Sequence, residues 1–297
     1  MKSKQETILI TGASGFTGKH ACNYFVQEGM RVVGLSRTAE QPDTPYEYRQ
    51  HDLSDYEGLE YIVQKINPTY ILHLAGMNSV STSWEDPIQC MNTNLISTLN
   101  VLEAVRKKAP GCQVLVVGSL LQFNPLNETH APHPYSLSKS FQTIAAQNWS
   151  HFFNQKIMIA KPSNLIGPGH SSGVCSIFAQ KMISIENGET ENQFSINPNV
   201  VRDFVDVRDA VRAYHTLLKH GENGQIYEIG SGKGKSLREI VDELQKLTTT
   251  QLNVTETSEN EVDVYVAENV RPITRLNWKP IISFSHSISD IVMYFRT

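Results

Sequence analysis

The sequence predicts an α/β fold in which a doubly wound parallel sheet is joined to a smaller C-terminal lobe. Three observations lead to this prediction. An apolar strand at Thr7–Thr11 runs into the glycine-rich stretch GASGFTG, strand and helix signals alternate through the first half, and the pattern becomes irregular after Pro162. Repeated strand–helix units form parallel sheets with right-handed crossovers, and their ligands lie beyond the carboxyl ends of the strands.

In the first half, short apolar runs and the turn residues between them predict alternating strands and helices. Strands are expected at Thr7–Thr11, Arg31–Ser36, Tyr70–Leu74, Gln113–Gly118 and Lys156–Ala160. Helices are expected at Phe16–Glu28, Tyr56–Ile66, Ile88–Lys108 and Tyr135–Phe153. The polar segment Thr38–Arg49, which contains two prolines, is expected to be a loop.

The second half shows fewer strand signals. One strand is expected at Gln225–Ile229, and Gly167–Gly173 is expected to be a loop. Helices are expected at Val174–Glu186, Asp206–Lys219, Ser236–Leu247 and Ser285–Phe295, the third beginning with a capping box of Ser236 and Glu239. We therefore expect a dinucleotide-type domain over residues 1–161, rejoined by about 203–232, and a smaller lobe formed mostly by 162–297.

Composition limits the expected partners. The 297 residues carry a net charge of −4, which favours neither nucleic acid nor an anionic membrane surface as a partner. No apolar run has the length of a membrane span, and the initial MKSKQET has no signal-peptide core. The cysteines at 22, 90, 112 and 175 are far apart, which favours free thiols in a reducing cytoplasm over disulfides or a metal site.

The glycine-rich stretch predicts a dinucleotide-binding turn of the Rossmann type. Gly12 would allow the tight turn, Gly15 would let the backbone approach the phosphates, and Gly18 would let the helix pack on the strand. The N–H groups and dipole at the start of the following helix favour an anion. A plain strand-to-helix turn without a ligand is the alternative.

Three further residues could carry proton chemistry. Tyr135 and Lys139 in YSLSK are four positions apart and share one helix face. A neighbouring ammonium is expected to lower the tyrosine pKa, so that Tyr135 can exchange a proton with a carbonyl or alcohol oxygen. Ser119, at the end of a strand, could hydrogen-bond the same oxygen. The alternative for Tyr135 and Lys139 is a solvated pair.

The end of the second strand bears on the type of dinucleotide. NAD-binding folds usually place an acid there, whereas this chain has Ser36 and Arg37, and an arginine can pair with a 2′-phosphate. NADP(H) is therefore the preferred expectation, with NAD(H) possible if Asp43 or another loop acid reaches the ribose. Asp52 could meet the adenine edge or simply cap a turn.

The motifs TGASGFTG, HDL, HLAG, YSLSK and RDFVDVRD occur in this order along the chain. Together they resemble the extended short-chain dehydrogenase/reductases of the NAD-dependent epimerase/dehydratase family, which act on nucleotide sugars. The segments AKPSNLIGPGH and QIYEIGSGKGKSLREIV are similar to the family's GDP-4-keto-6-deoxymannose reductases. The resemblance implies a Rossmann domain that binds NADPH and a smaller lobe that binds the sugar nucleotide.

The resemblance also implies roles for individual residues. The implied catalytic residues are Ser119, Tyr135 and Lys139. The implied cofactor-binding residues are Gly12, Gly15, Phe16, Thr17, Gly18, Ser36, Arg37, Asp52, Leu53, Leu74, Ala75, Gly76, Tyr135, Lys139 and Pro162. The implied substrate-binding residues are Ser83, Ser119, Asn164 and Arg202. Asn94 corresponds to a structural asparagine, with a water-facing helix residue as the alternative, and Asp206 and Asp209 are expected to hold helix and loops together.

The chain departs from the family pattern in places. Leu121 stands where the family's dehydratases carry a glutamate, so 4,6-dehydration is not expected. An Arg-Pro pair is replaced near Ser258 and Glu259, so its contact with a diphosphate would be missing or would come from Arg271 or Lys233.

The expected activity is NADPH-dependent reduction of the C4 keto group of a nucleotide-linked 4-keto-6-deoxyhexose. One alternative is a nucleotide-sugar C4 epimerase with bound NAD, and a second is a non-catalytic dinucleotide-binding protein. The identity of the nucleotide stays open. A homodimer formed through the helices at 88–108 and 135–153 is expected from the resemblance.

Overall fold

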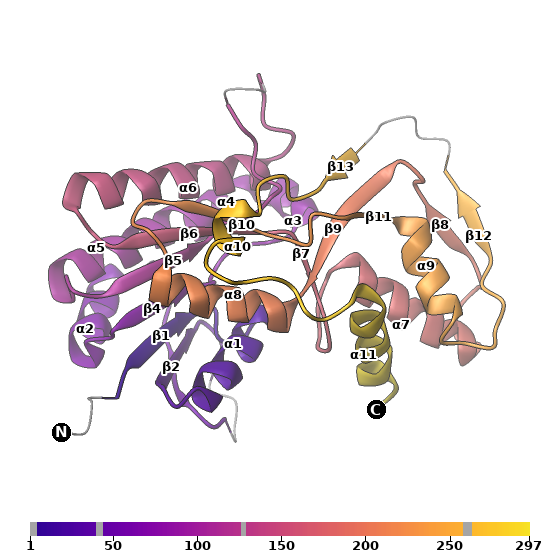
Figure 1. The fold of residues 1–297 in the computed structure, drawn as a ribbon, viewed down its shortest axis with the longest axis horizontal. Coiled ribbons are helices and arrows are strands. Elements are labelled where there is room, and N and C mark those ends of the chain that lie inside the picture. Colours follow the sequence, from indigo (N-terminus) through magenta and orange to yellow (C-terminus); the bar gives the residue numbers. More distant parts are fainter. Residues whose placement is uncertain (1–4, 40–43, 126–128, 258–262) are drawn as a thin grey trace. The chain divides into compact units, whose positions relative to one another are not determined.

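The computed structural model describes residues 5–39, 44–125, 129–257 and 263–297, which form two compact units (Figure 1). Unit 1 comprises Met1–Lys161 and Val211–Tyr227, and unit 2 comprises Pro162–Ala210 and Glu228–Thr297. Each unit has a hydrophobic core of its own.

The centre of unit 1 is a seven-stranded sheet in the order β10-β6-β5-β4-β1-β2-β3. Its strands are β1 (Thr7–Thr11), β2 (Arg31–Ser36), β3 (Glu47–Gln50), β4 (Tyr70–His73), β5 (Gln113–Val117), β6 (Ile157–Pro162) and β10 (Ile226–Ile229). The pairings of β1 with β2 and β4, β2 with β3, β4 with β5 and β5 with β6 are all parallel. The order of the first six strands is that of Rossmann folds, whose switch point lies between β1 and β4. The predicted Rossmann-type α/β fold is confirmed.

Helices cover both faces of this sheet. They are α1 (Phe16–Gln27), α2 (Tyr56–Ile66), α3 (Val80–Glu85), α4 (Pro87–Met91), α5 (Ser97–Lys108), α6 (Pro134–Phe153) and α8 (Val207–His220). Alternate strand residues such as Leu9 and Ile71 pack with α2 and α5 in one core, while α1 and α8 lie against the other face, where Phe25 meets His215 (Figure 1). None of the described helices is long and apolar enough to span a bilayer.

Two predictions in unit 1 were wrong in detail. The segment expected to be a loop ends in β3, an edge strand in which only Tyr48 is buried and Glu47 pairs with Arg31 and Arg49. A short edge strand needs few apolar residues, so its pattern is weak. The helix expected at Ile88–Lys108 is interrupted by a π-helical turn at Asn92–Ile96 between α4 and α5.

Unit 2 is built around short strands. They are β7 (Asn164–Ile166), β8 (Phe194–Ile196), β9 (Val200–Asp206), β11 (Gly234–Ser236), β12 (Val254–Glu256) and β13 (Asp263–Tyr265). β9 pairs with β7, β11 and β13, and β8 pairs with β12. Its helices are α7 (Val174–Glu186), α9 (Leu237–Gln245), α10 (Arg271–Thr274) and α11 (Phe284–Arg296). The capping box of Ser236 and Glu239 at the start of α9 is confirmed.

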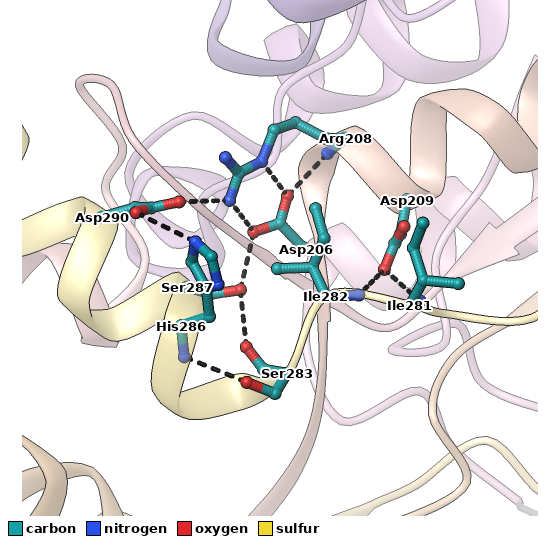
Figure 2. Close-up of polar contacts among 9 residues, drawn as sticks. All are labelled: Asp206, Arg208, Asp209, Ile281, Ile282, Ser283, His286, Ser287 and Asp290. Atoms are coloured by element: carbon teal, nitrogen blue, oxygen red, sulfur yellow. Dashed lines mark hydrogen bonds and ion pairs between the residues drawn. The ribbon is translucent and has the colours of Figure 1, made fainter.

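Buried aspartates at the end of β9 and at the start of α8 hold these elements to later segments of unit 2 (Figure 2). Asp206 accepts hydrogen bonds from Arg208 Nε at 2.8 Å and from Ser287 Oγ at 2.6 Å, and Arg208 also pairs with Asp290 at 2.6 Å. Burial opposes ionisation of Asp206, but these hydrogen bonds outweigh it and hold its pKa below the ordinary value. Asp209 Oδ2 accepts from the N–H groups of residues 281 and 282, each at 2.8 Å. Both aspartates therefore have the structural role expected of them.

Candidate active site

The glycine turn between β1 and α1 leaves no room for side chains at two positions. Gly12 has φ +72°, and a Cβ there would lie 2.8 Å from the amide nitrogen of Ala75. A Cβ on Gly18 would lie 2.1 Å from the carbonyl oxygen of Gly12. Gly15 is exposed and caps α1, with Phe16 and Thr17 in the first helical turn. The first-turn N–H groups of α1, next to the exposed Gly15, fit a dinucleotide pyrophosphate.

The carboxyl ends of β1 and β4 are joined at the switch point. The Thr11 carbonyl accepts from the Leu74 N–H at 3.3 Å, and the Thr11 hydroxyl accepts from the Ala75 N–H at 3.2 Å. A Cβ on Gly76 would lie 2.8 Å from Asn94 Oδ1 and 3.3 Å from Lys139 Nζ. The segment 74–76 therefore lies directly against the predicted catalytic lysine.

The end of β2 presents the residues expected to select the dinucleotide. The Ser36 hydroxyl lies 2.6 Å from that of Ser14 in the glycine turn, and Arg37 is exposed. Asp43 lies outside the described residues. A hydroxyl and a neighbouring arginine thus occupy the position at which NAD-binding folds usually carry an acid.

Asp52 and Leu53 follow β3. Asp52 is exposed and accepts from the Ser54 N–H at 2.9 Å, and hydrogen bonds from Ser54 together with the charge of Arg37 lower its pKa. Leu53 is buried, and its carbonyl accepts from Asn100 Nδ2 at 2.8 Å. Asp52 therefore caps a turn, and its carboxylate still faces solvent.

Ser119, Tyr135 and Lys139 come together beside β4 and β5, each at most 8% exposed. The Ser119 hydroxyl hydrogen-bonds the Tyr135 hydroxyl, and the Tyr135 N–H donates to Ser83 Oγ at 3.1 Å. Lys139 Nζ donates to the Val117 carbonyl at 3.2 Å. Ser83 thus fixes the start of α6 through a backbone contact.

Burial dominates the titration of this cluster. It raises the pKa of Tyr135 to about 12, against the hydrogen bond from Ser119, and lowers the pKa of Lys139 to about 8. The expectation that Lys139 lowers the Tyr135 pKa was therefore wrong. The Lys139 ammonium is directed to Val117 and Gln142, so its charge does not offset the desolvation of the phenol.

Asn94 is fully buried in the π-helical turn, so the water-facing alternative was wrong. Its side chain accepts from the Met77 N–H at 2.8 Å and donates to the Met77 carbonyl at 3.1 Å and to Ser138 Oγ at 2.8 Å. It therefore fixes the segment after β4 to helix α6.

The remaining predicted residues belong to unit 2. Pro162 is buried at the end of β6, and Asn164 Nδ2 donates to the Asp203 carbonyl at 3.2 Å. Arg202 pairs with the Asp263 carboxylate, donates to the Asp263 carbonyl at 2.6 Å and lies over the Tyr265 ring at 5.1 Å. Lys233 and Arg271 are exposed, and Ser258 and Glu259 lie outside the described ranges.

The sequence did not single out His73, Thr98 and Gln142, all of which are fully buried near Lys139. The only sequence signal for His73 is a histidine inside an apolar strand. Thr98 and Gln142 lie in helices, and the local sequence pattern does not show that these two polar side chains face the interior.

A Rossmann sheet with a glycine turn at its switch point, and a buried serine, tyrosine and lysine beside it, defines an extended short-chain dehydrogenase/reductase. The model of the NAD dependent epimerase/dehydratase family matches residues 8–230, and the chain belongs to this family. Members of the family act on nucleotide sugars with a nicotinamide dinucleotide.

Several relatives match almost the whole chain. GDP-6-deoxy-D-mannose reductase of Pseudomonas aeruginosa is 27% identical, over 97% of this chain and 96% of that protein. A putative UDP-glucose 4-epimerase of Methanocaldococcus jannaschii is 26% identical, over 97% and 98%. The structure of RMD from Pseudomonas aeruginosa complexed with NADPH superposes with a TM-score of 0.80 at 26% identity, covering 99% of this chain and 100% of that one.

Proposed function

We propose that the protein is an NADPH-dependent reductase of the C4 keto group of a nucleotide-linked 4-keto-6-deoxyhexose. The observation that carries the proposal is the Ser119–Tyr135 hydroxyl pair, with Lys139 one helical turn further along α6. The similarity to GDP-6-deoxy-D-mannose reductase over nearly the full length supports this reaction within the family.

In the proposed mechanism the side chains donate a proton to the substrate and orient its carbonyl group. When bound, NADPH would supply a hydride to the carbonyl carbon. The Tyr135 hydroxyl donates its proton to the carbonyl oxygen, and its high pKa keeps it protonated at neutral pH. Ser119 Oγ orients the same oxygen, and the Lys139 ammonium binds the nicotinamide ribose.

The rest of the proposed cofactor site follows the strand ends. The turn of Gly12, Gly15 and Gly18, with Phe16 and Thr17, would hold the pyrophosphate. Ser36 and Arg37 would bind the 2′-phosphate, because a guanidinium pairs well with phosphate oxygens. The other proposed cofactor contacts are Asp52 and Leu53 at the adenine, and Leu74, Ala75, Gly76 and Pro162 along the nicotinamide half.

Substrate contacts are proposed for Ser83, Ser119, Asn164 and Arg202, with unit 2 as the lobe that binds the nucleotide sugar. Leu121 has no acidic group to act as the base of an elimination, which argues against 4,6-dehydration. Its backbone N–H instead donates to Ser119 Oγ at 3.1 Å.

The proposal is tested by following NADPH oxidation with GDP-, UDP-, CDP- and dTDP-linked 4-keto-6-deoxy sugars, with NADH run alongside. Oxidation with one nucleotide would establish the reaction and the base together, and a preference for NADPH that Arg37→Ala removes would support the 2′-phosphate contact. A protein that binds NADPH but oxidises it with none of these sugars would contradict the proposal.

A nucleotide-sugar C4 epimerase is the second candidate, because the Methanocaldococcus jannaschii relative is matched at 26% identity. An epimerase would retain NAD through purification and interconvert C4 epimers without net oxidation of NADPH. A non-catalytic dinucleotide-binding protein would do neither, and would tolerate loss of the Tyr135 hydroxyl.

We also propose a homodimer formed by α6 and by the segment of α4, the π-helical turn and α5. Six large apolar side chains on these elements are exposed, namely Ile88 at 70%, Ile96 at 44%, Phe141 at 42%, Ile144 at 42%, Phe152 at 62% and Phe153 at 44%. Apolar side chains grouped on neighbouring helices are typical of an interface.

A further inference from the structure

A continuous series of buried polar side chains connects the end of β1 to the catalytic lysine of unit 1. We call it the polar chain, and its members are Thr11, His73, Thr98, Gln142 and Lys139. They come from β1, β4, α5 and α6, and each is at most 5% exposed. Buried side chains from four elements therefore meet in the interior of unit 1.

The hydrogen bonds at Thr98 fix its proton and one proton of His73. The Thr98 hydroxyl donates to the Asn94 carbonyl at 2.7 Å and accepts from Gln142 Nε2 at 2.8 Å. Its remaining lone pair faces His73 Nε2 at 2.9 Å. Because the single hydroxyl proton is already used, His73 Nε2 must carry the hydrogen of this contact.

The other end of the polar chain is fixed in the same way. Burial and the nearby charge of Lys139 lower the pKa of His73 to about 3, so the ring is neutral and its Nδ1 is an acceptor. Nδ1 accepts from the Thr11 hydroxyl at 2.8 Å, and Thr11 Oγ1 in turn accepts from the Ala75 N–H at 3.2 Å. The hydroxyl protons of Thr11 and Thr98 and the ring proton of His73 are therefore each assigned to one hydrogen bond.

At Lys139, the polar chain ends on an ammonium that has lost most of its water. Lys139 Nζ donates to Gln142 Oε1 at 2.9 Å and to the Val117 carbonyl at 3.2 Å. These acceptors use two of its three N–H groups and leave one for a ligand. A buried charge needs such partners, and an acceptor next to it favours the charged form.

We propose that Gln142 is a positioning residue for Lys139, with its amide oxygen holding the ammonium and its amide NH₂ anchored on Thr98. The amide has one useful orientation. A flipped side chain would place its NH₂ group against the Lys139 ammonium and its oxygen against Thr98 Oγ1, which has no proton left to donate. Through His73 and Thr11, the same contacts tie the position of Lys139 to the strand ends that carry the dinucleotide turn. The proposal rests on the proposed function only in assigning Lys139 to the nicotinamide ribose.

The direct test is the titration of Lys139, followed by NMR of ¹³C-labelled lysine with the signal assigned by its absence in Lys139→Arg. The titratable groups near Lys139 include His73 on β4, Cys90 on α4 and Tyr135 on α6. None of them is changed in the variants to be compared. These variants are Gln142→Leu, which removes the acceptor, and Gln142→Glu, which replaces it with a charged one of nearly the same shape.

We expect Gln142→Leu to lower the titration midpoint of Lys139 by about one pH unit and Gln142→Glu to raise it by about as much, because hydrogen bonds to charged groups are strong. Gln147→Leu is the matched control. Gln147 lies on the same helix and donates to the Gly224 carbonyl at 3.2 Å, away from Lys139. It should leave the midpoint unchanged.

NADPH affinity, measured by fluorescence across the same pH range, gives a second readout. The pH above which NADPH affinity falls should be lower in Gln142→Leu and higher in Gln142→Glu than in the wild type. If Gln142 had a purely structural role, its replacement would weaken binding equally at every pH. A Lys139 midpoint unmoved in both variants, with thermal melts showing folded protein, would overturn the proposal. Absence of sugar reduction in the wild type would contradict the proposed function alone, since neither readout requires turnover.

Discussion

Arg202, on the central strand of the unit 2 sheet, is paired with the carboxylate of Asp263 on the adjacent strand β13. The guanidinium also contacts the Asp263 carbonyl and the Tyr265 ring. A diphosphate bound by Arg202 would have to share or replace this carboxylate.

Asp263→Asn is therefore expected to lower the KM for the nucleotide sugar. The carboxylate is 40% exposed, so solvent screening limits the effect to about two- to fivefold. Arg202→Ala should raise the KM by about tenfold or more. Asp242→Asn, which breaks the exposed Arg238–Asp242 pair, is the control and should change nothing. A higher KM in Asp263→Asn would mean that Asp263 instead holds Arg202 in place for binding.

Tyr135→Phe should lower kcat by about two powers of ten or more, the usual contribution of a general acid. NADPH affinity should be kept, because the ring still packs beside His133, with centroids 5.9 Å apart. Steady-state kinetics and fluorescence titration measure the two effects. Tyr56→Phe, which removes a hydroxyl from α2, is the matched control, and retention of more than a tenth of kcat in Tyr135→Phe would exclude the assigned role.

Activity and NADPH affinity should fall as the pH rises through about 8. In this range Lys139 loses its charge, whereas Tyr135, with a pKa of about 12, stays protonated. Stability should not fall in parallel. An unfolded lysine titrates near about 10.4, so between these values the unfolded state binds more protons and the contribution of Lys139 to folding stability rises with pH. Kinetics and thermal melts on the same samples check both signs, and a flat profile from pH 7 to 10 would contradict the role of Lys139.

Gly18→Ala should destabilise the protein by about 1–3 kcal/mol, because the new Cβ must displace the turn at Gly12. A Cβ there would lie 2.1 Å from a backbone carbonyl oxygen. Denaturant unfolding measures the loss, and NADPH affinity should fall with it. Gly111→Ala is the control, since a Cβ at Gly111 has no atom within 4 Å. Equal stability of the two variants would show that the turn can shift freely.

Sedimentation should show a dimer for the wild type and a monomer for Ile88→Glu and Phe141→Glu. Each change places a charge in the proposed apolar interface, where it would lose its water without gaining a partner. Ile281→Glu is the control, since Ile281 is 67% exposed but belongs to unit 2. A monomeric wild type would remove the proposed interface.

The sheet of unit 1 could be predicted because parallel strands buried on both faces are continuous apolar runs. β1 and β2 occur at the predicted residues for this reason. β9 was not predicted, because it contains two buried aspartates. Asp203 accepts from Ser231 and Gly232, and Asp206 accepts from Ser287, so both are satisfied by residues far along the chain. No local pattern contains those partners.

The same distinction applies to the candidate site. The spacing of Tyr135 and Lys139 is local and could be read directly, as could the order of the glycines. The environment of Lys139 could not, because Val117 on β5 and Thr98, which anchors Gln142 from α5, lie near it only when strand and helices are packed. The burial that sets its pKa is a property of the folded unit rather than of the sequence motif.

The path of the chain between the two units bears on how the protein is made. The chain leaves unit 1 after Lys161, returns at Val211 and leaves again after Tyr227. Edge strand β10 lies next to β6, and Ile159 donates to the Gln225 carbonyl at 3.1 Å. During synthesis, β6 therefore emerges from the ribosome more than sixty residues before the strand that covers it. An apolar strand left open for that interval can pair with other chains, so aggregation of nascent protein should depend on how quickly elongation reaches β10.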